Sequence, residues 1–356
     1  MSPAASHRWI FLFALLLASA ALAAPASEAA DESLSCPTQG DRLTFPYPPQ
    51  VPEGWEHDRF GTTGGDTLTI EAGAFVSAFT PPDREEEGSP YRGLPRWVAY
   101  EMRALLDETG VPLQPAGARR PGHWYELEQT AALWRDRPGL THAGLDRSYR
   151  GFATHWNRGH LAARAHANRL GWRDGCNSHV FINALPEQAG LNQGEWEALE
   201  NHAVAVANLF GRVWTIAGPV FEPDQPVETI GAPGTVPLAV PHALFKILAV
   251  ETPAGLEARA FLFPQDGVYH RCLATPQDSY DLGRHAVTLA RLEALTGLRF
   301  FTHLSPAHRA EIELDSAAGP WPVPAALYAR RCGPRGGRGL PGRGDPPDSG
   351  PEHHGS

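Results

Sequence analysis

Apolar runs and amphipathic segments alternate along most of this chain. Residues 213–216, 244–250 and 258–263 are apolar runs bounded by polar or turn residues, which predicts three buried strands. The alternating segment 68–71 predicts a further strand. Between residues 192 and 210 the apolar positions recur in steps of three and four, which predicts a helix with one buried face. Those positions are Trp196, Leu199, Ala203, Val206 and Phe210.

Two further signals complete the predicted elements. Residues 286–295 have a helical pattern that ends before Gly297, a residue type that commonly terminates helices. Asn192 stands at the start of the segment 192–210 and is expected to cap that helix. Residues 46–92 are rich in Pro, Gly and Thr and predict an irregular extension ahead of the main fold. The pattern therefore predicts one mixed α+β domain.

The N-terminus has the features of an export signal. His7 and Arg8 precede an apolar run from Trp9 to Ala24, and Ala21-Leu22-Ala23, with small residues at its first and third positions, suits cleavage. We therefore expect residues 1–23 to be a signal peptide, and the mature protein to be secreted or periplasmic and free of the membrane. An uncleaved membrane anchor is the alternative, although the run is shorter than the ~20 residues that span a bilayer.

The remaining boundaries follow from composition. Residues 24–45 are small and polar and predict a linker, and residues 46–332 form the expected domain. Residues 333–356 contain 8 Gly and 5 Pro with no apolar periodicity, which predicts a disordered tail.

All four cysteines follow the predicted cleavage site. An even number in an exported chain favours two disulfides, and the sequence leaves all three possible pairings open. The four are Cys36, Cys176, Cys272 and Cys332. A zinc site at Cys176 and His179, completed by His155 or His166, is the alternative, although structural zinc sites usually show two close pairs of ligands.

The charge is unevenly distributed. The whole chain carries −10, but residues 119–173 contain ten arginines and four acidic residues, a local charge of +6. A basic segment inside an acidic chain favours a phosphate-binding surface over a merely solvated one when catalytic residues share the segment. Lysine is almost absent, with Lys246 the only one, so the arginine excess also reflects a general preference of this chain.

The basic segment contains Arg158-Gly159-His160. Asn192 and Glu200 follow in the predicted helical segment 192–210. Arginine neutralises phosphate, and a free imidazole titrates near ~6.5, so that it can deprotonate water. Amide and carboxylate oxygens suit magnesium. Asn192 and Glu200 lie about 12 Å apart along a helix at ~1.5 Å per residue, so direct binding of one small cation by both is not expected.

Three motifs in this order resemble the DNA/RNA non-specific endonucleases, which are ββα-metal (His-Me finger) nucleases related to endonuclease G and to secreted bacterial nucleases. The family pattern is Asp-Arg-Gly-His, then Asn-x-x-Pro-Gln, then Leu-Asn-x-Gly-x-Trp-x-x-Leu-Glu. This chain has Asn157-Arg158-Gly159-His160, Asn183-Ala184-Leu185-Pro186-Glu187-Gln188 and 191–200 in those places. Shorter matches extend the resemblance over residues 90–301. It implies a mainly antiparallel central sheet flanked by helices.

The resemblance also implies roles for individual residues. His160 would be the general base, Arg158 would bind phosphate, and Asn192 would bind Mg²⁺ directly, with Mn²⁺ or another divalent ion as possible substitutes. Glu200 would hold water bound to the metal. Arg135 is a candidate for stabilising charge in the transition state, and Asn183 for orienting the site, with a surface arginine and an ordinary turn residue as the respective alternatives.

Asn157 is the one departure in the first motif, where the family usually has Asp. Asn keeps the shape of the side chain and loses its charge, and some relatives, including a mitochondrial endo/exonuclease branch, also lack the Asp. Asn157 is a further candidate for binding substrate. The function expected is Mg²⁺-dependent hydrolysis of phosphodiester bonds in DNA and RNA, by a monomer or a homodimer. The alternatives are a weak or inactive nuclease-like protein that binds nucleic acid, and a metal-dependent hydrolase of another phosphodiester, including a zinc enzyme.

Overall fold

The structure is a computed structural model. It describes residues 35–36, 38–40, 42–43, 51–64, 67–86, 88–115, 117–118, 121, 124–127, 140–150, 152, 155–268 and 280–329. The predicted signal peptide and the predicted C-terminal tail lie outside the described residues, as do Arg135, Cys272 and Cys332.

A seven-stranded sheet forms the centre of the fold, and every pairing between its neighbouring strands is antiparallel. The strand order is β14-β13-β12-β9-β6-β5-β4. In chain order the strands are β4 (Leu68–Glu71), β5 (Val76–Phe79), β6 (Trp97–Arg103), β9 (Arg212–Val220), β12 (Ala243–Thr252), β13 (Gly255–Pro264) and β14 (Ala286–Val287). The buried strands predicted from the apolar runs correspond to β9, β12 and β13.

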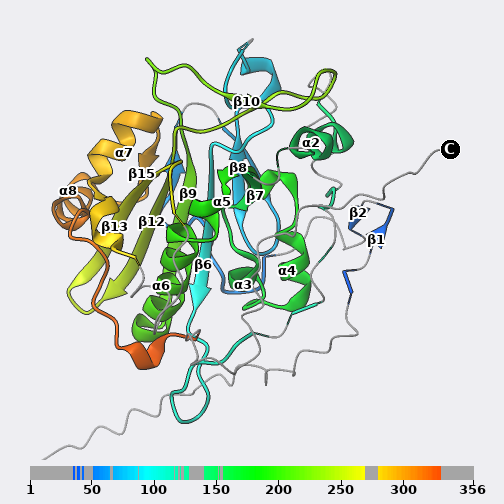
Figure 1. Cartoon of the computed structure of the whole chain (residues 1–356). Coiled ribbons are helices and arrows are strands. Elements are labelled where there is room, and N and C mark those ends of the chain that lie inside the picture. The colour runs from blue at the N-terminus through cyan, green and yellow to red at the C-terminus, as the bar shows by residue number, and fades with distance from the viewer. Residues whose placement is uncertain are drawn as a thin grey trace, which may run out of the picture.

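Helices cover both faces of the sheet (Figure 1). The long helix α6 (Glu195–Phe210) packs on one face, and α7 (Leu289–Thr296) and α8 (Pro306–Asp315) pack on the other. Alternate residues of β6 show the consequence: Val98 and Tyr100 belong to the core under α6, whereas Trp97 and Ala99 belong to the core under α7 and α8. Because both faces are covered at the centre of the sheet, the strands β9 and β12 are apolar almost throughout.

The N-terminal part of the chain is more regular than predicted. Strands β4 and β5 extend the central sheet. The strand predicted at 68–71 is β4, whereas β5 falls where an irregular extension was predicted, and that prediction is wrong for residues 76–79. The short strands β1 (Thr38–Gln39) and β2 (Arg42–Leu43) pair within the segment predicted as a linker. A disulfide joins Cys36 to Cys176 and ties this segment to the main fold. Ordered structure therefore begins before residue 46.

The remaining elements are short strands, helices and turns outside the central sheet. Among the described residues, no helix is both long enough and apolar enough to cross a bilayer. The further elements are β3 (Thr62–Thr63), β7 (Trp156–His160), β8 (Ala184–Gln188), β10 (Thr229–Ile230), β11 (Leu238–Ala239), β15 (Arg299–Phe300), α2 (His142–Tyr149), α3 (Arg164–Ala167), α4 (Trp172–Asn177), α5 (Ala189–Asn192), and the 3-10 turns η1 (Pro82–Arg84), η2 (Phe181–Asn183), η4 (Leu282–His285) and η5 (Ala325–Leu327).

Candidate active site

The three sequence motifs lie on a two-stranded antiparallel hairpin and the helices that follow it. Strands β7 and β8 pair with Asn157 opposite Glu187 and with His160 opposite Ala184. The chain then continues directly into α5 and α6, beside the central sheet (Figure 1). The predicted helix 192–210 is therefore broken: α5 ends at Asn192 and α6 begins at Glu195. Asn192 is not an N-cap, because Gly194 occupies that position.

Asn157 and Asn192 are hydrogen-bonded to each other. The Nδ2 of Asn192 donates to Oδ1 of Asn157 over 2.8 Å, and Nε2 of Gln193 donates to the same oxygen over 3.1 Å. Asn157 is buried, at 7% exposure, so its contact is with the neighbouring amides. With Nδ2 engaged, Asn192 has Oδ1 as the group able to bind a cation. Asn157 thus orients the candidate metal ligand, which is a different role from the substrate binding considered for it.

Gly159 lies inside strand β7 and not in a turn. A Cβ atom at this position would lie 2.1 Å from Oε2 of Glu187, a distance at which atoms overlap. The glycine therefore makes room for the Glu187 side chain.

Glu200, on α6, faces the central sheet. Its Oε1 accepts a hydrogen bond from Nζ of Lys246 over 3.3 Å, and Lys246 lies on β12. That ammonium lies 3.8 Å from the ring centre of Trp196, whose Nε1 donates to the carbonyl of His160 over 3.2 Å. Trp196 consequently links the strand that carries His160 to the ion pair between the partly buried Glu200 and the fully buried Lys246.

His160 is the last residue of β7 and is half-buried among aromatic rings. Its ring centre lies 4.6 Å from that of Trp124 and 4.7 Å from that of His179. Asn183 fixes the chain just beyond it: its Oδ1 accepts from the Ala162 backbone, and its Nδ2 donates to the Ala162 carbonyl over 2.8 Å. Asn183 is fully buried, so its contribution is to position the end of β7.

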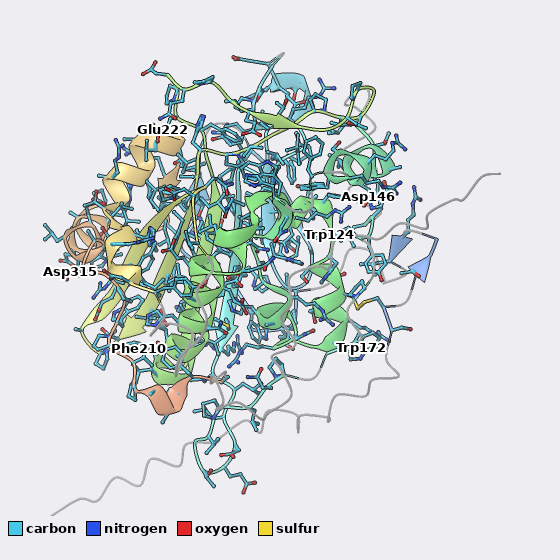
Figure 2. The ribbon with its side chains drawn as sticks, in the orientation of Figure 1. Trp124, Asp146, Trp172, Phe210, Glu222 and Asp315 are labelled. Carbon is cyan, nitrogen blue, oxygen red and sulfur yellow. A yellow bond between two sulfur atoms is a disulfide. The ribbon has the colours of Figure 1, made fainter. Side chains whose placement is uncertain are left out.

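Arg158 is held by helix α2, on the side of the molecule where Trp124 and Asp146 are labelled in Figure 2. Its Nη2 donates to Oδ1 of Asp146 over 2.8 Å, and its guanidinium lies 5.2 Å from the ring centre of Tyr149. Asp146 therefore orients Arg158 and neutralises part of its charge.

Some arginines of the basic segment are structural. Arg169 donates twice to the Arg103 carbonyl, and burial lowers its pKa to about 10. Arg164 donates to the Ala118 carbonyl. The +6 charge of this segment is thus only in part available to a phosphate.

The hairpin and the helices α5 and α6 carry oxygen groups of the kind that bind a hard cation. They are the amide oxygens of Asn157 and Asn192 and the carboxyl groups of Glu187 and Glu200, and both carboxyl oxygens of Glu187 are buried with no hydrogen-bond partner among the described residues. No cluster of three or more His, Cys, Asp or Glu side chains in the described part of the chain is placed to hold a metal. A cation here would need one or two protein ligands and several waters, as Mg²⁺ prefers.

The disulfide contradicts the alternative of a zinc site at Cys176 and His179. The sulfur of Cys176 is bonded to that of Cys36 and supplies no thiolate. Of the three pairings open to the cysteines, the structure contains Cys36–Cys176. Glu187 and Lys246 were missed as members of the site. The signals that point to them are the Glu at the position of the family's Gln, and the single lysine of the chain.

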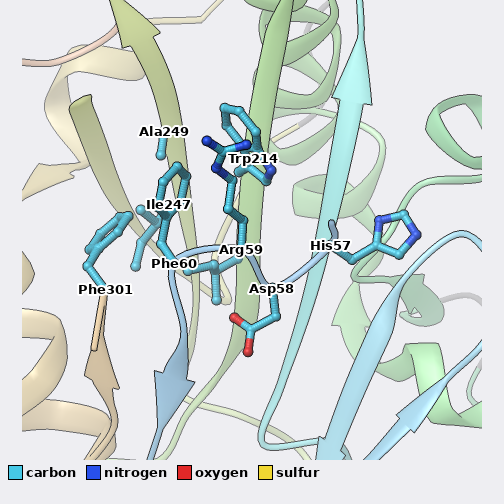
Figure 3. Close-up of a pocket in the computed structure, with 9 residues that line it drawn as sticks. His57, Asp58, Arg59, Phe60, Trp214, Ile247, Ala249 and Phe301 are labelled. Atoms are coloured by element: carbon cyan, nitrogen blue, oxygen red, sulfur yellow. The ribbon is translucent and has the colours of Figure 1, made fainter. Parts of the chain in front are cut away.

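A cavity lies on the opposite face of the sheet, near α7 and α8 (Figure 3). Its lining includes Asp58, Phe60, Trp214 and Phe301, and none of the predicted site residues. Arg59 extends along Trp214, with its guanidinium 5.2 Å from the ring centre. This cavity is separate from the hairpin and belongs to the second core.

Asp58, in this cavity, is expected to make stability depend on pH. Burial raises the pKa of Asp58 from 3.8 to about 6, although the Thr62 backbone donates to its carboxyl. Between these pH values the folded chain holds a proton that the unfolded chain releases, so this group's contribution to stability falls as pH rises from about 4 to about 6. Asp58→Asn should flatten the dependence of the unfolding temperature on pH over that range. Thermal unfolding at several pH values measures it, with the exposed Asp224→Asn as control, and an unchanged slope would contradict it.

The hairpin, the following helices and the central antiparallel sheet define a mixed α+β protein with a ββα site. The sequence matches the family model of the DNA/RNA non-specific endonucleases over residues 87–307. This is more than half of the 356 residues, and the chain belongs to that family. The family and the fold class predicted from the sequence are confirmed, and the enzyme class of the family is endonuclease.

Individual relatives match part of the chain. The human mitochondrial nuclease EXOG is 27% identical over 158 residues, 42% of this chain and 40% of EXOG. A nuclease of Serratia marcescens is 30% identical over 173 residues, 46% of this chain and 59% of the nuclease. This chain thus spans about two fifths to three fifths of these relatives' length.

Among solved structures, a chain of the EndoG/EndoGI complex, in which EndoG is inhibited, is similar to this chain with a TM-score of 0.50 and 18% identity. The match covers 70% of this chain and 92% of the solved chain. At this identity the likeness shows the fold alone.

Proposed function

We propose that this protein is a divalent-metal-dependent nuclease that hydrolyses phosphodiester bonds of DNA and RNA with little sequence preference. The observation that carries the proposal is the hydrogen bond between Asn157 and Asn192, which joins the hairpin of His160 to the candidate cation ligand. Membership of the endonuclease family supports it. Recognition through phosphates, which carry no sequence information, fits an arginine-bearing site.

The residues divide the chemistry among them. His160 accepts the proton of a water molecule that attacks phosphorus in line, and the bond from phosphorus to the 3′ oxygen breaks, which leaves a 5′ phosphate. Arg158, oriented by Asp146, binds a phosphate oxygen. Asn192 binds the cation through Oδ1, and Glu200 holds water in its shell. Mg²⁺, when bound, would stabilise the negative charge that develops on the leaving oxygen.

Export is part of the proposal. The apolar segment near the N-terminus supports secretion or transfer to the periplasm. The Cys36–Cys176 disulfide supports the same conclusion, because disulfides persist in oxidising compartments. The mature chain would then meet DNA and RNA outside the cytoplasm.

Chelation tests the proposed function directly. Incubation of the disulfide-intact protein with plasmid DNA and with RNA should give cleavage with Mg²⁺ or Mn²⁺ and none with a chelator. Without the cation, the neutral amide of Asn192 cannot stabilise the negative charge that develops on the leaving oxygen. Asn192→Ala should reduce the cleavage at low Mg²⁺, while Asn201→Ala, on α6 with a local bond to the Glu197 carbonyl, should not. Gel assays of the products measure both effects.

Three outcomes would redirect the interpretation. Cleavage that resists chelation would exclude the metal-dependent mechanism. Binding of nucleic acid without cleavage, under every divalent ion, would support the nuclease-like binding protein. Hydrolysis of a small phosphodiester with no cleavage of DNA or RNA would support a hydrolase of another phosphodiester.

A further inference from the structure

Glu187 is a buried carboxyl without a hydrogen-bond partner. Its side chain is fully buried, and neither Oε1 nor Oε2 has a partner among the described residues. A polar group left in this state costs stability unless it binds something. A role at the site would explain why such a group is present.

The position of Glu187 is set by the hairpin. It lies directly opposite Asn157 in the ladder of β7 and β8, so the two side chains emerge on the same face. The carboxyl group extends over Gly159, which has no side chain to block it. Glu187 therefore lies beside the residue that orients Asn192.

The neighbouring charges leave a demand for a cation. Glu187 interacts electrostatically with Glu200 and with Lys246, so two carboxyl groups share one ammonium. A dication at Asn192 would supply the positive charge that the carboxyl groups of Glu187 and Glu200 lack when they share one ammonium.

Two substitutions relative to the family pattern fit together. Asn157 stands where the pattern has Asp, and Glu187 stands where it has Gln. These two positions face each other across the ladder. We propose that Glu187 supplies to the cation site the negative charge that Asn157 lacks. Compared with the family pattern, the carboxylate is on β8 instead of β7, and the amide is on β7 instead of β8.

This inference rests on the proposed function, because it assigns a residue to the cation site of that function. Its test is cation binding, measured without substrate by calorimetry with Mn²⁺ and by the rise in unfolding temperature on adding Mg²⁺. Glu187→Gln should weaken binding by about tenfold, the lower end for residues that support metal ligands. Glu187→Gln with Asn157→Asp should recover most of the native affinity.

A matched control separates this role from general stability. Glu195, also buried, begins α6 and pairs with Arg284 and His285. Glu195→Gln should therefore leave cation affinity within about twofold. Without metal, Glu187→Gln should unfold at the same temperature as the native protein or higher, because it removes a buried carboxyl that has no hydrogen-bond partner.

Several results would overturn the inference. One is unchanged cation affinity in Glu187→Gln while the native protein cleaves DNA in a metal-dependent manner, which would leave the proposed function intact. Another is weakened binding that Asn157→Asp does not recover, since the charge would then not be exchangeable between the two strands. A native protein that binds no divalent cation would contradict the inference and the proposed function together.

Discussion

Replacement of His160 by alanine should lower the rate of plasmid cleavage by about 100-fold or more, because a positioned general base contributes roughly 10²–10⁴-fold to such reactions. The expected loss is in the catalytic rate, with little change in nucleic-acid binding, since Arg158 and the candidate cation ligands are untouched. Single-turnover cleavage at saturating protein, together with a binding assay at the same salt, measures the two separately.

Two further variants make this expectation specific. His160→Gln keeps a polar side chain between Trp124 and His179, so it guards against a loss caused by misfolding. His155→Ala removes an exposed imidazole just before the same strand and should cleave at the native rate. Cleavage by His160→Ala within threefold of native would exclude His160 as the base, and a loss confined to His179→Ala would transfer that role to the adjacent ring.

The sequence predicted the central strands and the order of the motifs because these depend on local pattern. Residues 68–71, 213–216, 244–250 and 258–263 are apolar or alternating over their own length, and each lies in a strand. The fold class followed from them. The break before α6 was not predicted, because the apolar spacing begins at Trp196 and carries no information on the residues between Asn192 and Glu195, where Gly194 is the N-cap.

The missed parts of the site depend on long-range contact. Glu187 lies on the hairpin and Lys246 on a sheet strand, and only packing of α6 on β12 brings them together with the predicted Glu200. Gly159 illustrates the same limit. The motif correctly marks it as a position that needs glycine, but the reason is a side chain on the opposite strand, which no local pattern encodes.

Arginine content was a poor guide to exposed charge for a related reason. Arg169 is buried against a backbone carbonyl, and Arg158 shares its charge with Asp146. A count along the sequence cannot separate arginines that hold loops together from those that face solvent. The Asn157–Asn192 bond was likewise invisible, although both residues had been singled out, because the two lie 35 positions apart.

Lys246→Met should destabilise the protein by about 3 kcal/mol or more, the usual cost of removing one partner from a buried ion pair. Lys246 is the only lysine of the chain and is fully buried, with its ammonium between Glu200 and the Trp196 ring. Methionine has a similar length, so the change removes the charge with little change in packing. Urea unfolding without divalent cations measures the loss.

The control and the rescue identify the cause as charge. Arg259 also lies over a tryptophan, Trp321, and pairs with Glu257, but this pair is nearer to solvent, so Arg259→Met should cost only about 1 kcal/mol. Adding Glu200→Gln to Lys246→Met should recover part of the lost stability, because one uncompensated carboxyl is removed. If Lys246→Met is no less stable than Arg259→Met, then Glu200 and Glu187 are not ionised together in the folded chain. The proposal that Glu187 supplies negative charge to a cation beside Asn192 would then lose much of its support.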